Sequence, residues 1–318
     1  MKALITGITG FAGGFLAEHL LACGDEVLGC SRSGRWPAWA GAELRRLGLL
    51  ACDVGDAAGI TDQARQQIAR FTPDCIYHLA ALSVPADCGT IEPAGRAIEV
   101  NVGGTSRVLE LASDLARKPR VVFISTSHVY GAATEQHHLL DEATPAAPRR
   151  AYGKTKWLAE QVATRARSEQ GLDVLVVRSF QHSGPRQEPR LMLPEWTAQF
   201  VGGEEAVRVK HLNTWIDLSD VRDVVRAYRL LAEQGEQNGV YNVGSGVARR
   251  TGGILDVLRR LAGPDREIIE QQPGDERWDP IADIRRLQAA TGWRPEIELE
   301  TTVRDTLDYW RQAAVRRG

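Results

Sequence analysis

The first half of the chain alternates short apolar runs with longer stretches typical of helices. Hydrophobicity within the runs is continuous rather than alternating, as expected for strands that are covered on both faces of a parallel sheet. We therefore predict strands at residues 3–6, 26–30, 47–51, 75–79, 121–125 and 174–178. The cover is predicted to come from helices at 57–70, 98–116 and 154–169. This pattern indicates an α/β fold with a doubly wound parallel sheet.

The pattern changes after residue 178, where two proline-containing turns and the pair Gly202-Gly203 interrupt it. A later apolar run at 239–243 is predicted to return to the main sheet. The predicted parts are a Rossmann dinucleotide-binding domain at 1–178 with a return segment at 213–243, and a smaller α/β substrate-binding lobe at 179–212 and 244–318. Because the two parts interleave in sequence, we expect a rigid interface with a cleft between them.

A glycine motif lies where the first predicted strand turns into a helix. It reads Gly7-Ile8-Thr9-Gly10-Phe11-Ala12-Gly13. Glycines permit a tight turn there and let the backbone approach a pyrophosphate, whose charge is stabilised by free N–H groups at the positive end of the helix dipole. An isolated glycine-rich turn is a weak signal, but its position between a strand and a helix predicts a dinucleotide site.

A second motif, Tyr152-Gly153-Lys154-Thr155-Lys156, begins a predicted helix. Residues four apart lie on one helix face, so Tyr152 and Lys156 can point together at a cofactor and a substrate. A tyrosine with a pKa of about 10 is a poor base at neutral pH, but a neighbouring ammonium group favours the phenolate and lowers that pKa. Hydroxyl side chains at 125–127 end a strand at the sheet edge where ligands bind.

These motifs resemble the extended short-chain dehydrogenase/reductase family, whose members act on nucleotide-activated sugars. The resemblance runs nearly end to end and also includes His78-Leu79-Ala80-Ala81, Asn101-Val102-Gly103-Gly104-Thr105 and Val129-Tyr130-Gly131. It implies a catalytic triad of Thr126, Tyr152 and Lys156. The residues that it places at the cofactor, besides the glycine motif, Tyr152 and Lys156, are Asp53, Val54, Leu79, Ala80, Ala81 and Asn101.

Two of these residues have further interpretations. Asn101 is expected from the resemblance to steady the active-site backbone. Asp53 is expected to contact the adenine, although a carboxylate directly after a strand can instead cap a turn. Both interpretations of Asp53 are kept.

The end of the second strand predicts the choice of cofactor. NAD-selective sheets of this kind usually carry an acidic residue there, which binds the ribose diol. This chain has Ser31 and Arg32 instead. A guanidinium and a hydroxyl can hold a 2′-phosphate through charge-assisted hydrogen bonds, so we predict NADP, with NAD as the alternative if Arg32 is only solvated.

The substrate site is predicted from the stretch 178–187 and from positions that match the family. The pattern of His182, Pro185 and Arg186 is closest to the GDP-mannose 4,6-dehydratases and the GDP-4-keto-6-deoxy-mannose reductases. An arginine that commonly binds phosphate in the family is replaced by Asn213, and Arg186, Arg190 or Arg277 could take its place. The predicted substrate contacts are Ser83, Ser127, His128, Gln181, His182, Arg186, Arg190, Asn213 and Arg277.

His128 bears on the type of reaction. In the resembling dehydratases an acidic residue stands at this position, so its replacement disfavours loss of water, although histidine can act as an acid or base near neutral pH. A packing role for His128 is equally open. We expect an NADPH-dependent reductase of a nucleotide-linked 4-keto-6-deoxy sugar, GDP-linked, with a nucleotide-sugar epimerase as the alternative. A cofactor-sensing protein without turnover is the third hypothesis.

Composition and charge agree with a small-molecule substrate. The 318 residues are 43% hydrophobic and 25% charged, with a formal net charge of -2. We therefore expect neither nucleic acid nor an anionic membrane as a partner. No apolar run approaches the roughly 20 residues that span a bilayer, so we expect a cytosolic protein.

Metal binding and assembly complete the expectations. Five scattered cysteines predict small buried apolar residues, and the pair His137-His138 has no partner ligands at suitable spacing, so no metal is predicted. The family resemblance implies a homodimer that is packed through the helices near 101–116 and 154–166.

Overall fold

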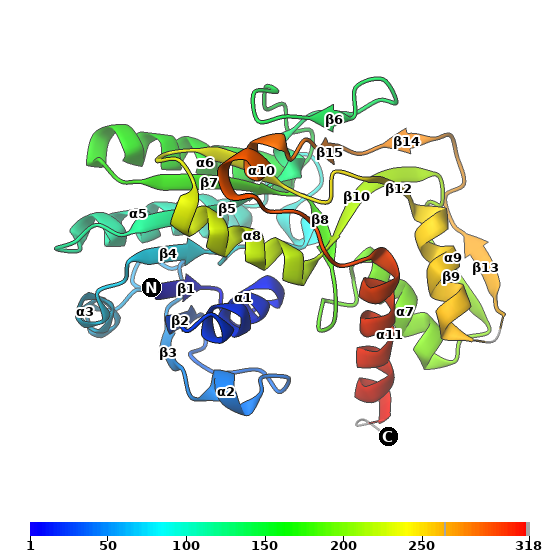
Figure 1. Cartoon of the computed structure of the whole chain (residues 1–318), viewed down its shortest axis with the longest axis horizontal. Helices are drawn as coiled ribbons and strands as arrows, with labels where there is room; N and C mark the ends of the chain where they lie inside the picture. The colour runs from blue at the N-terminus through cyan, green and yellow to red at the C-terminus, as the bar shows by residue number, and fades with distance from the viewer. Residues whose placement is uncertain (264, 316–318) are drawn as a thin grey trace.

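In the computed structural model, which describes residues 1–263 and 265–315, a seven-stranded sheet forms the larger part of the molecule (Figure 1). All of its neighbouring strands are parallel, in the order β11-β7-β5-β4-β1-β2-β3. The strands are β1 (Lys2–Thr6), β2 (Glu26–Ser31), β3 (Gly48–Ala51), β4 (Cys75–His78), β5 (Arg120–Thr126), β7 (Val174–Ser179) and β11 (Val240–Val243). This order confirms the predicted doubly wound sheet.

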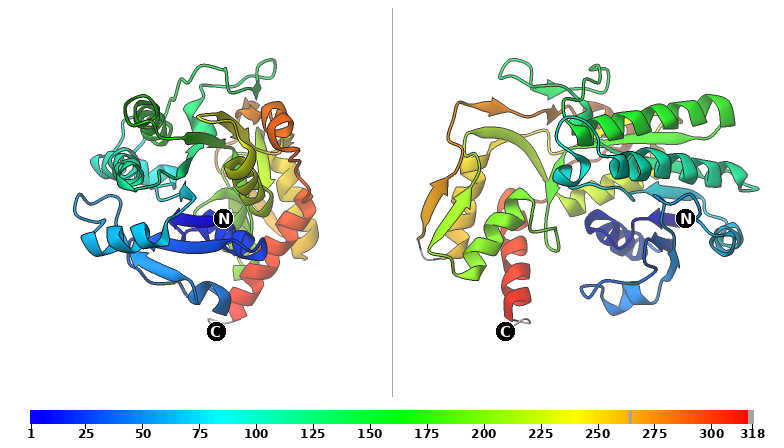
Figure 2. Two further views of the ribbon diagram at one scale, coloured as in Figure 1. Left: turned by 60° about the vertical axis from the view of Figure 1, so that its left-hand side comes forward. Right: turned by 180° about the vertical axis from the view of Figure 1, so that it is seen from behind.

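Helices cover both faces of this sheet. On one face, α1 (Phe11–Ala22) packs against α8 (Val221–Gln234), which also contacts α10 (Arg285–Thr291). On the other face, α5 (Gly104–Asp114) packs against α6 (Ala151–Gln170), as the two views of Figure 2 show. Two separate apolar clusters fill the two interfaces. All six residues of β7 are buried, which explains why the strands are continuously apolar in sequence.

The remaining helical segments of this part connect the strands. They are α2 (Ala42–Arg45), α3 (Asp62–Phe71), η1 (Pro85–Cys88), α4 (Gly95–Ile98), η2 (Glu99–Gly103) and η3 (Ser127–Val129). The turn η2 is a π-helical segment between α4 and α5, so these three elements form one interrupted helix. Such a π-turn changes the direction of side chains within a helix and often lies at a functional site.

A smaller lobe packs around its own apolar core. Its strand β10 (Thr214–Asp220) pairs with β8 (Gln181–Ser183), β12 (Ala248–Arg250) and β14 (Arg277–Trp278). A second pair consists of β9 (Ala206–Val209) and β13 (Glu267–Glu270). The helices are α7 (Met192–Gly202), α9 (Thr251–Ala262) and α11 (Leu299–Val315), which lie together on the right of Figure 1.

The strand pairing corrects one expectation. The segment 213–243 was expected to return to the main sheet as one block, but only α8 and β11 join the larger part. The first strand, β10, lies instead at the centre of the lobe sheet. Its apolar residues Ile216 and Leu218 face the core of the lobe, and this burial decides the pairing.

The two parts are also joined by a short strand pair and a buried carboxylate. Strand β15 (Ile281–Ala282) of the lobe pairs with β6 (Leu139–Leu140), which follows β5 in the chain. Asp217 of β10 accepts hydrogen bonds from the backbone N–H groups of Ser245, Gly246 and Ala282, at 2.7, 3.0 and 3.0 Å. The lobe segment 277–283 is therefore fixed next to the carboxyl end of β5.

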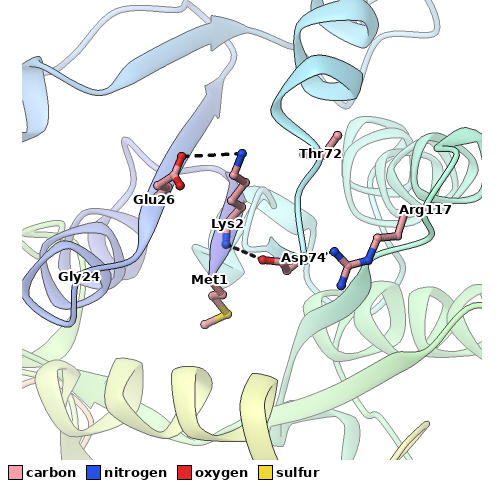
Figure 3. Close-up of a pocket in the computed structure, with 7 residues that line it drawn as sticks. All are labelled: Met1, Lys2, Gly24, Glu26, Thr72, Asp74 and Arg117. Atoms are coloured by element: carbon pink, nitrogen blue, oxygen red, sulfur yellow. Dashed lines mark hydrogen bonds and ion pairs between the residues drawn. The ribbon is translucent and has the colours of Figure 1, made fainter.

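A hollow of about 330 Å³ lies at the opposite, amino end of the strands (Figure 3). Lys2 crosses it, with its backbone N–H donating to Asp74 at 2.8 Å and its ammonium 3.9 Å from Glu26. Ligands of doubly wound sheets bind at the carboxyl ends of the strands. The hollow therefore lies at the edge of the sheet opposite to the predicted cofactor site.

Candidate active site

The glycine turn between β1 and α1 leaves the end of the helix open to an anion. Gly7 has a φ of +74°, and a Cβ atom there would lie 2.8 Å from the backbone nitrogen of Ala80. A Cβ atom on Gly13 would lie 2.3 Å from the Gly7 carbonyl oxygen. Gly10 is the N-cap of α1 and offers no side-chain acceptor to the first N–H groups. These features fit a dinucleotide pyrophosphate, which would accept those hydrogen bonds.

Two polar side chains lie at the end of β2: Ser31, which forms a hydrogen bond, and Arg32, which is exposed. Ser31 is buried, and its hydroxyl accepts a hydrogen bond from the Gly34 N–H at 3.1 Å. Arg32 is exposed, and no hydrogen bond or ion pair to its guanidinium is found within residues 1–263 and 265–315. The guanidinium is therefore available to a phosphate.

Asp53 behaves as a turn cap. One carboxylate oxygen accepts from the Gly55 N–H at 2.9 Å, and the other pairs with Arg96 at 3.2 Å. The next residue, Val54, is buried, and its carbonyl accepts from Arg107 at 2.7 Å. The structure thus supports the capping interpretation of Asp53, and its contact with the adenine stays a prediction.

Helix α6 approaches the end of β5 so closely that position 153 accepts only glycine. A Cβ atom on Gly153 would lie 2.1 Å from the carbonyl oxygen of His128 in η3. This approach brings Tyr152, in the first turn of α6, within reach of Thr126 at the end of β5, and the two side chains can share a hydrogen bond. Lys156, one turn further along α6, is only 3% exposed, and its ammonium lies 4.4 Å from the centre of the Phe123 ring.

Burial sets the protonation of these groups. It raises the pKa of Tyr152 to about 12, and the hydrogen bond with Thr126 opposes this rise only in part. Burial also lowers the pKa of Lys156 to about 8, against the attraction of the Glu160 carboxylate. The expected net lowering of the Tyr152 pKa is not found, because removal of the phenol from water is the largest effect and Lys156 is not among the groups that shift this pKa. Near neutral pH, Tyr152 is a protonated phenol and Lys156 is mostly an ammonium.

Asn101 holds the backbone around this site. Its side chain is 1% exposed and lies in the π-turn η2. The amide oxygen accepts from the Leu82 N–H at 2.8 Å, while the amide nitrogen donates to the Leu82 carbonyl at 3.1 Å and to the Thr155 hydroxyl at 2.9 Å. These bonds use both donors and one acceptor position of the amide. Asn101 therefore ties the loop after β4, which contains Leu79, Ala80 and Ala81, to helix α6.

His128 faces Tyr152 from η3. Its ring meets the Tyr152 ring edge-on, with centroids 5.5 Å apart and an angle of 68°. Burial lowers the pKa of His128, and the carboxylate of Asp279 acts in the opposite direction. Asp279 also accepts a hydrogen bond from the Gln181 amide at 3.0 Å. The sequence analysis missed Asp279, since no local pattern marks a residue in the loop between β14 and β15.

The other predicted substrate contacts lie in different places. His182 stacks nearly parallel to Phe11 of the glycine turn, with centroids 5.9 Å apart. Ser127 is buried next to Thr126, whereas Ser83 is exposed in the loop after β4. Arg190 forms an exposed double hydrogen bond with Asp87, at 3.0 and 3.1 Å.

The predicted role of Arg186 as a substrate contact is not supported. Its guanidinium donates to both carboxylate oxygens of Glu18 in α1, at 2.8 and 2.7 Å. It also lies over the rings of Phe15 and Trp39, at 3.8 and 4.7 Å from their centres. These contacts engage both terminal nitrogens of the guanidinium and join the lobe to α1.

Arg277 lies beside Asn213, the position at which the resembling family carries an arginine, and its role at the substrate stays a prediction. The pairing of β10 with β14 brings the two residues together, and the backbone N–H of Arg277 donates to the Asn213 carbonyl at 2.9 Å, while its guanidinium contacts Nε2 of His211 at 2.7 Å. A second guanidinium, Arg250, donates to the Asn213 side chain at 3.0 Å. The sequence analysis missed Arg250 because the antiparallel pairing of β12 with β10 is not visible in the local sequence. Together these residues form a basic edge of the lobe that suits a diphosphate.

Known proteins show the same organisation. The model of the NAD dependent epimerase/dehydratase family matches residues 3–244, which contain the glycine turn, Thr126, Tyr152 and Lys156. The chain belongs to this family. It is therefore an NAD(P)-dependent enzyme, with a family-level function on sugar nucleotides.

Three similar proteins indicate the range of the family. GDP-6-deoxy-D-mannose reductase from Pseudomonas aeruginosa is 30% identical over 320 residues, which cover 97% of each chain. The structure of RMD from Pseudomonas aeruginosa complexed with NADPH has a TM-score of 0.84 at 25% identity and covers 98% of this chain and 99% of that one. UDP-glucose 4-epimerase with UDP-glucose, from Thermotoga maritima, has a TM-score of 0.86 at 26% identity and covers 99% and 100%.

Among the residues that the structure describes, no helix has the length and apolar character needed to cross a bilayer. Within the same residues, no group of three or more His, Cys, Asp or Glu side chains is arranged to hold a metal ion. Of the five cysteines, Cys23 alone is exposed, which differs from the prediction that all are buried.

The buried environment of Lys156 gives a first prediction. After reductive methylation with ¹³C-formaldehyde, one lysine resonance should titrate with a midpoint near pH 8, because burial lowers the pKa of Lys156 to about 8. Lys156→Arg should remove that resonance, while Lys118→Arg serves as the matched control. Glu160→Gln should move the midpoint to lower pH, since it removes the attraction that favours the ammonium. Titration of every lysine well above pH 9 would contradict this account of the site.

Proposed function

We propose that the protein is an NADPH-dependent reductase of a nucleotide-linked 4-keto-6-deoxy sugar, with GDP as the nucleotide. The observation that carries the proposal is the protonated phenol of Tyr152, next to Thr126 and one helical turn from a buried ammonium. A phenol that keeps its proton at neutral pH is suited to give a proton to a developing alkoxide. The similarity to GDP-6-deoxy-D-mannose reductase supports the choice of sugar nucleotide.

Each side chain of the site has a separate role in the proposed reduction. A bound NADPH supplies a hydride to the keto carbon. Tyr152 donates its proton to the carbonyl oxygen, and the Thr126 hydroxyl donates a hydrogen bond that orients the same oxygen. Lys156, one helical turn further along α6, would hold the ribose of the cofactor through its ammonium. Arg277 and Arg250 neutralise the diphosphate at the basic edge of the lobe.

A nucleotide-sugar epimerase is the second candidate. The structural similarity to UDP-glucose 4-epimerase, at 26% identity over nearly the whole of both chains, favours it. An epimerase would oxidise and then reduce the sugar with the same three residues, so it would consume no cofactor overall. The two functions are separated by the absorbance of the reduced nicotinamide, which falls in proportion to product only for a reductase.

Replacement of Tyr152 tests the proposed reaction. Tyr152→Phe should lower kcat for NADPH oxidation with GDP-4-keto-6-deoxy-mannose by a factor on the order of 100 or more, because the proton donor is lost. Its dissociation constant for NADPH should stay within about twofold. Tyr309→Phe, on α11, is the matched control and should retain full activity. The proposal fails if wild-type protein binds NADPH but oxidises none of it, or if Tyr152→Phe is as active as wild type.

The preference for NADP is a separate part of the proposal. It rests on the exposed guanidinium of Arg32 at the end of β2 and on the lack of an acidic residue there. Arg32→Ala should raise the dissociation constant for NADPH about 10- to 100-fold and change that for NADH little, since only NADPH carries the 2′-phosphate. Fluorescence titration of both cofactors measures this. Arg46→Ala, also exposed, is the control, and tighter binding of NADH by the wild type would refute the preference.

A homodimer through α5 and α6 is the last part of the proposal. Their outer face carries a hollow of about 200 Å³ lined by Ser106, Leu109, Val162, Arg165, Ala166, Glu169 and Gln170. Leu158, one turn before Val162 on α6, is 44% exposed. Leu158→Asp should convert a dimer to a monomer in sedimentation velocity, because a charge would be buried in an apolar contact. Val315→Asp, at the exposed end of α11, should leave the mass unchanged; a monomeric wild type would exclude the dimer.

A further inference from the structure

The loop that contains Asp279 is held rigidly beside the catalytic residues. The Asp279 N–H donates to the Trp215 carbonyl at 2.9 Å. The preceding Trp278 stacks on Trp215 at 5.0 Å and on His138 at 4.4 Å, measured between ring centroids. Two residues later, β15 pairs with β6. Contacts on both sides of Asp279 therefore fix the position of its carboxylate relative to β5 and α6.

One oxygen of the Asp279 carboxylate has a hydrogen-bond partner among the described residues, and the other has none. Its Oδ2 accepts a hydrogen bond from the Gln181 amide at 3.0 Å. In the part of the chain that the structure describes, no protein group donates to Oδ1 of Asp279. The ring nitrogens of His128 likewise form no hydrogen bond with any described residue. Asp279 is half-buried, and its Oδ1 is not among the buried side-chain atoms that lack a partner, so this oxygen is open to solvent and to a ligand. The open oxygen is therefore suited to a hydroxyl group of a ligand.

His128 links this carboxylate to the point of reaction. Its ring packs against the Tyr152 ring, and the negative charge of Asp279 raises the pKa of the same imidazole. Tyr152 lies next to Thr126 at the end of β5, whereas Asp279 belongs to the loop between β14 and β15 of the lobe. Asp279 thus lies beyond His128, at a distance from the carbonyl oxygen that Tyr152 protonates. A role in binding the sugar fits this position better than a role in the proton transfer.

We propose that Asp279 is a specificity-determining residue, whose carboxylate accepts a hydrogen bond from a hydroxyl on the sugar carbon next to the one that is reduced. This inference rests on the proposed function, because it assumes a keto sugar at Tyr152. In a 4-keto-6-deoxy hexose the two neighbours of the keto carbon are C3, which carries a hydroxyl, and C5, which carries a methyl group. The 3-hydroxyl is therefore the group that Asp279 selects.

The protonation of Asp279 adds a pH dependence. The groups that face it are His128 from η3, Arg150 at the start of α6 and Gln181 from β8. Burial raises the pKa of Asp279, and these three groups oppose the rise. Because the raised pKa favours the protonated acid, the accepting carboxylate is lost as pH falls, at a higher pH than for an exposed aspartate. KM for the sugar nucleotide should rise on this acidic limb, and Asp279→Ala should remove the limb.

The test compares two substrates in two proteins. Wild type should prefer GDP-4-keto-6-deoxy-mannose over the analogue that also lacks the 3-hydroxyl by about 10- to 100-fold in kcat/KM, the size expected for a hydrogen bond to a charged group. Asp279→Ala should reduce this preference to about twofold or less, with the loss mainly in KM and little change in kcat for the analogue. Asp275→Asn, which changes an exposed carboxylate on the same segment, should behave as wild type.

Binding measurements separate the two proposals. Calorimetry gives the dissociation constants of both sugar nucleotides without turnover, and Asp279→Asn, which can keep its contact with Gln181, provides a second variant if Asp279→Ala unfolds early. If wild type and both variants discriminate equally against the 3-deoxy compound, in KM and in affinity, the role of Asp279 is refuted. The reductase function is not affected by that result. If wild type binds the sugars with the expected preference but oxidises no NADPH, the reductase function fails and Asp279 keeps its role. Binding of neither sugar refutes both.

Discussion

The close approach of α6 to the end of β5 is the constraint on which the site depends. Gly153 makes it possible, because any side chain there would collide with the His128 carbonyl, at 2.1 Å from a Cβ atom. The approach removes water from the first turn of α6, and this desolvation raises the pKa of Tyr152 to about 12 and lowers that of Lys156 to about 8. The same packing that forms the interior of the protein therefore sets its acid–base chemistry.

Next to the site, a buried network of hydrogen bonds and one ion pair allows the charged side chain of Lys156 to be buried. Glu160, one turn after Lys156, accepts from the Ser125 hydroxyl at 2.5 Å and pairs with Arg178 at 2.9 Å. Arg178 also donates to the Tyr130 hydroxyl at 3.1 Å. A buried ion pair of this kind contributes little net stability, because desolvation offsets the attraction between the charges. Its contribution here is to place a fixed negative charge near an ammonium that burial would otherwise neutralise.

The sequence was sufficient wherever a feature depends on neighbours along the chain. The parallel strands follow from their apolar runs, and the glycine turn follows from its place between a strand and a helix. The pair Tyr152 and Lys156 follows from helical spacing. Contacts between distant segments were not predicted: Arg186 pairs with Glu18, Arg250 reaches Asn213 through strand pairing, and Asp279 approaches His128 from the lobe. No periodicity encodes such contacts, because tertiary packing alone brings these segments together.

The division of labour between the two parts explains how one arrangement can serve several reactions. The proposed reacting groups Thr126, Tyr152 and Lys156 all come from β5 and α6 of the larger part, where the parallel sheet fixes them. The groups proposed to bind the sugar and the diphosphate, including Asp279 and Arg277, come from short strands and loops of the lobe. A proton donor that is fixed relative to the nicotinamide site can act on any carbonyl that is presented to it. The lobe therefore decides which carbon of which sugar is presented, and the outcome of the reaction follows from that placement rather than from a change in the catalytic residues.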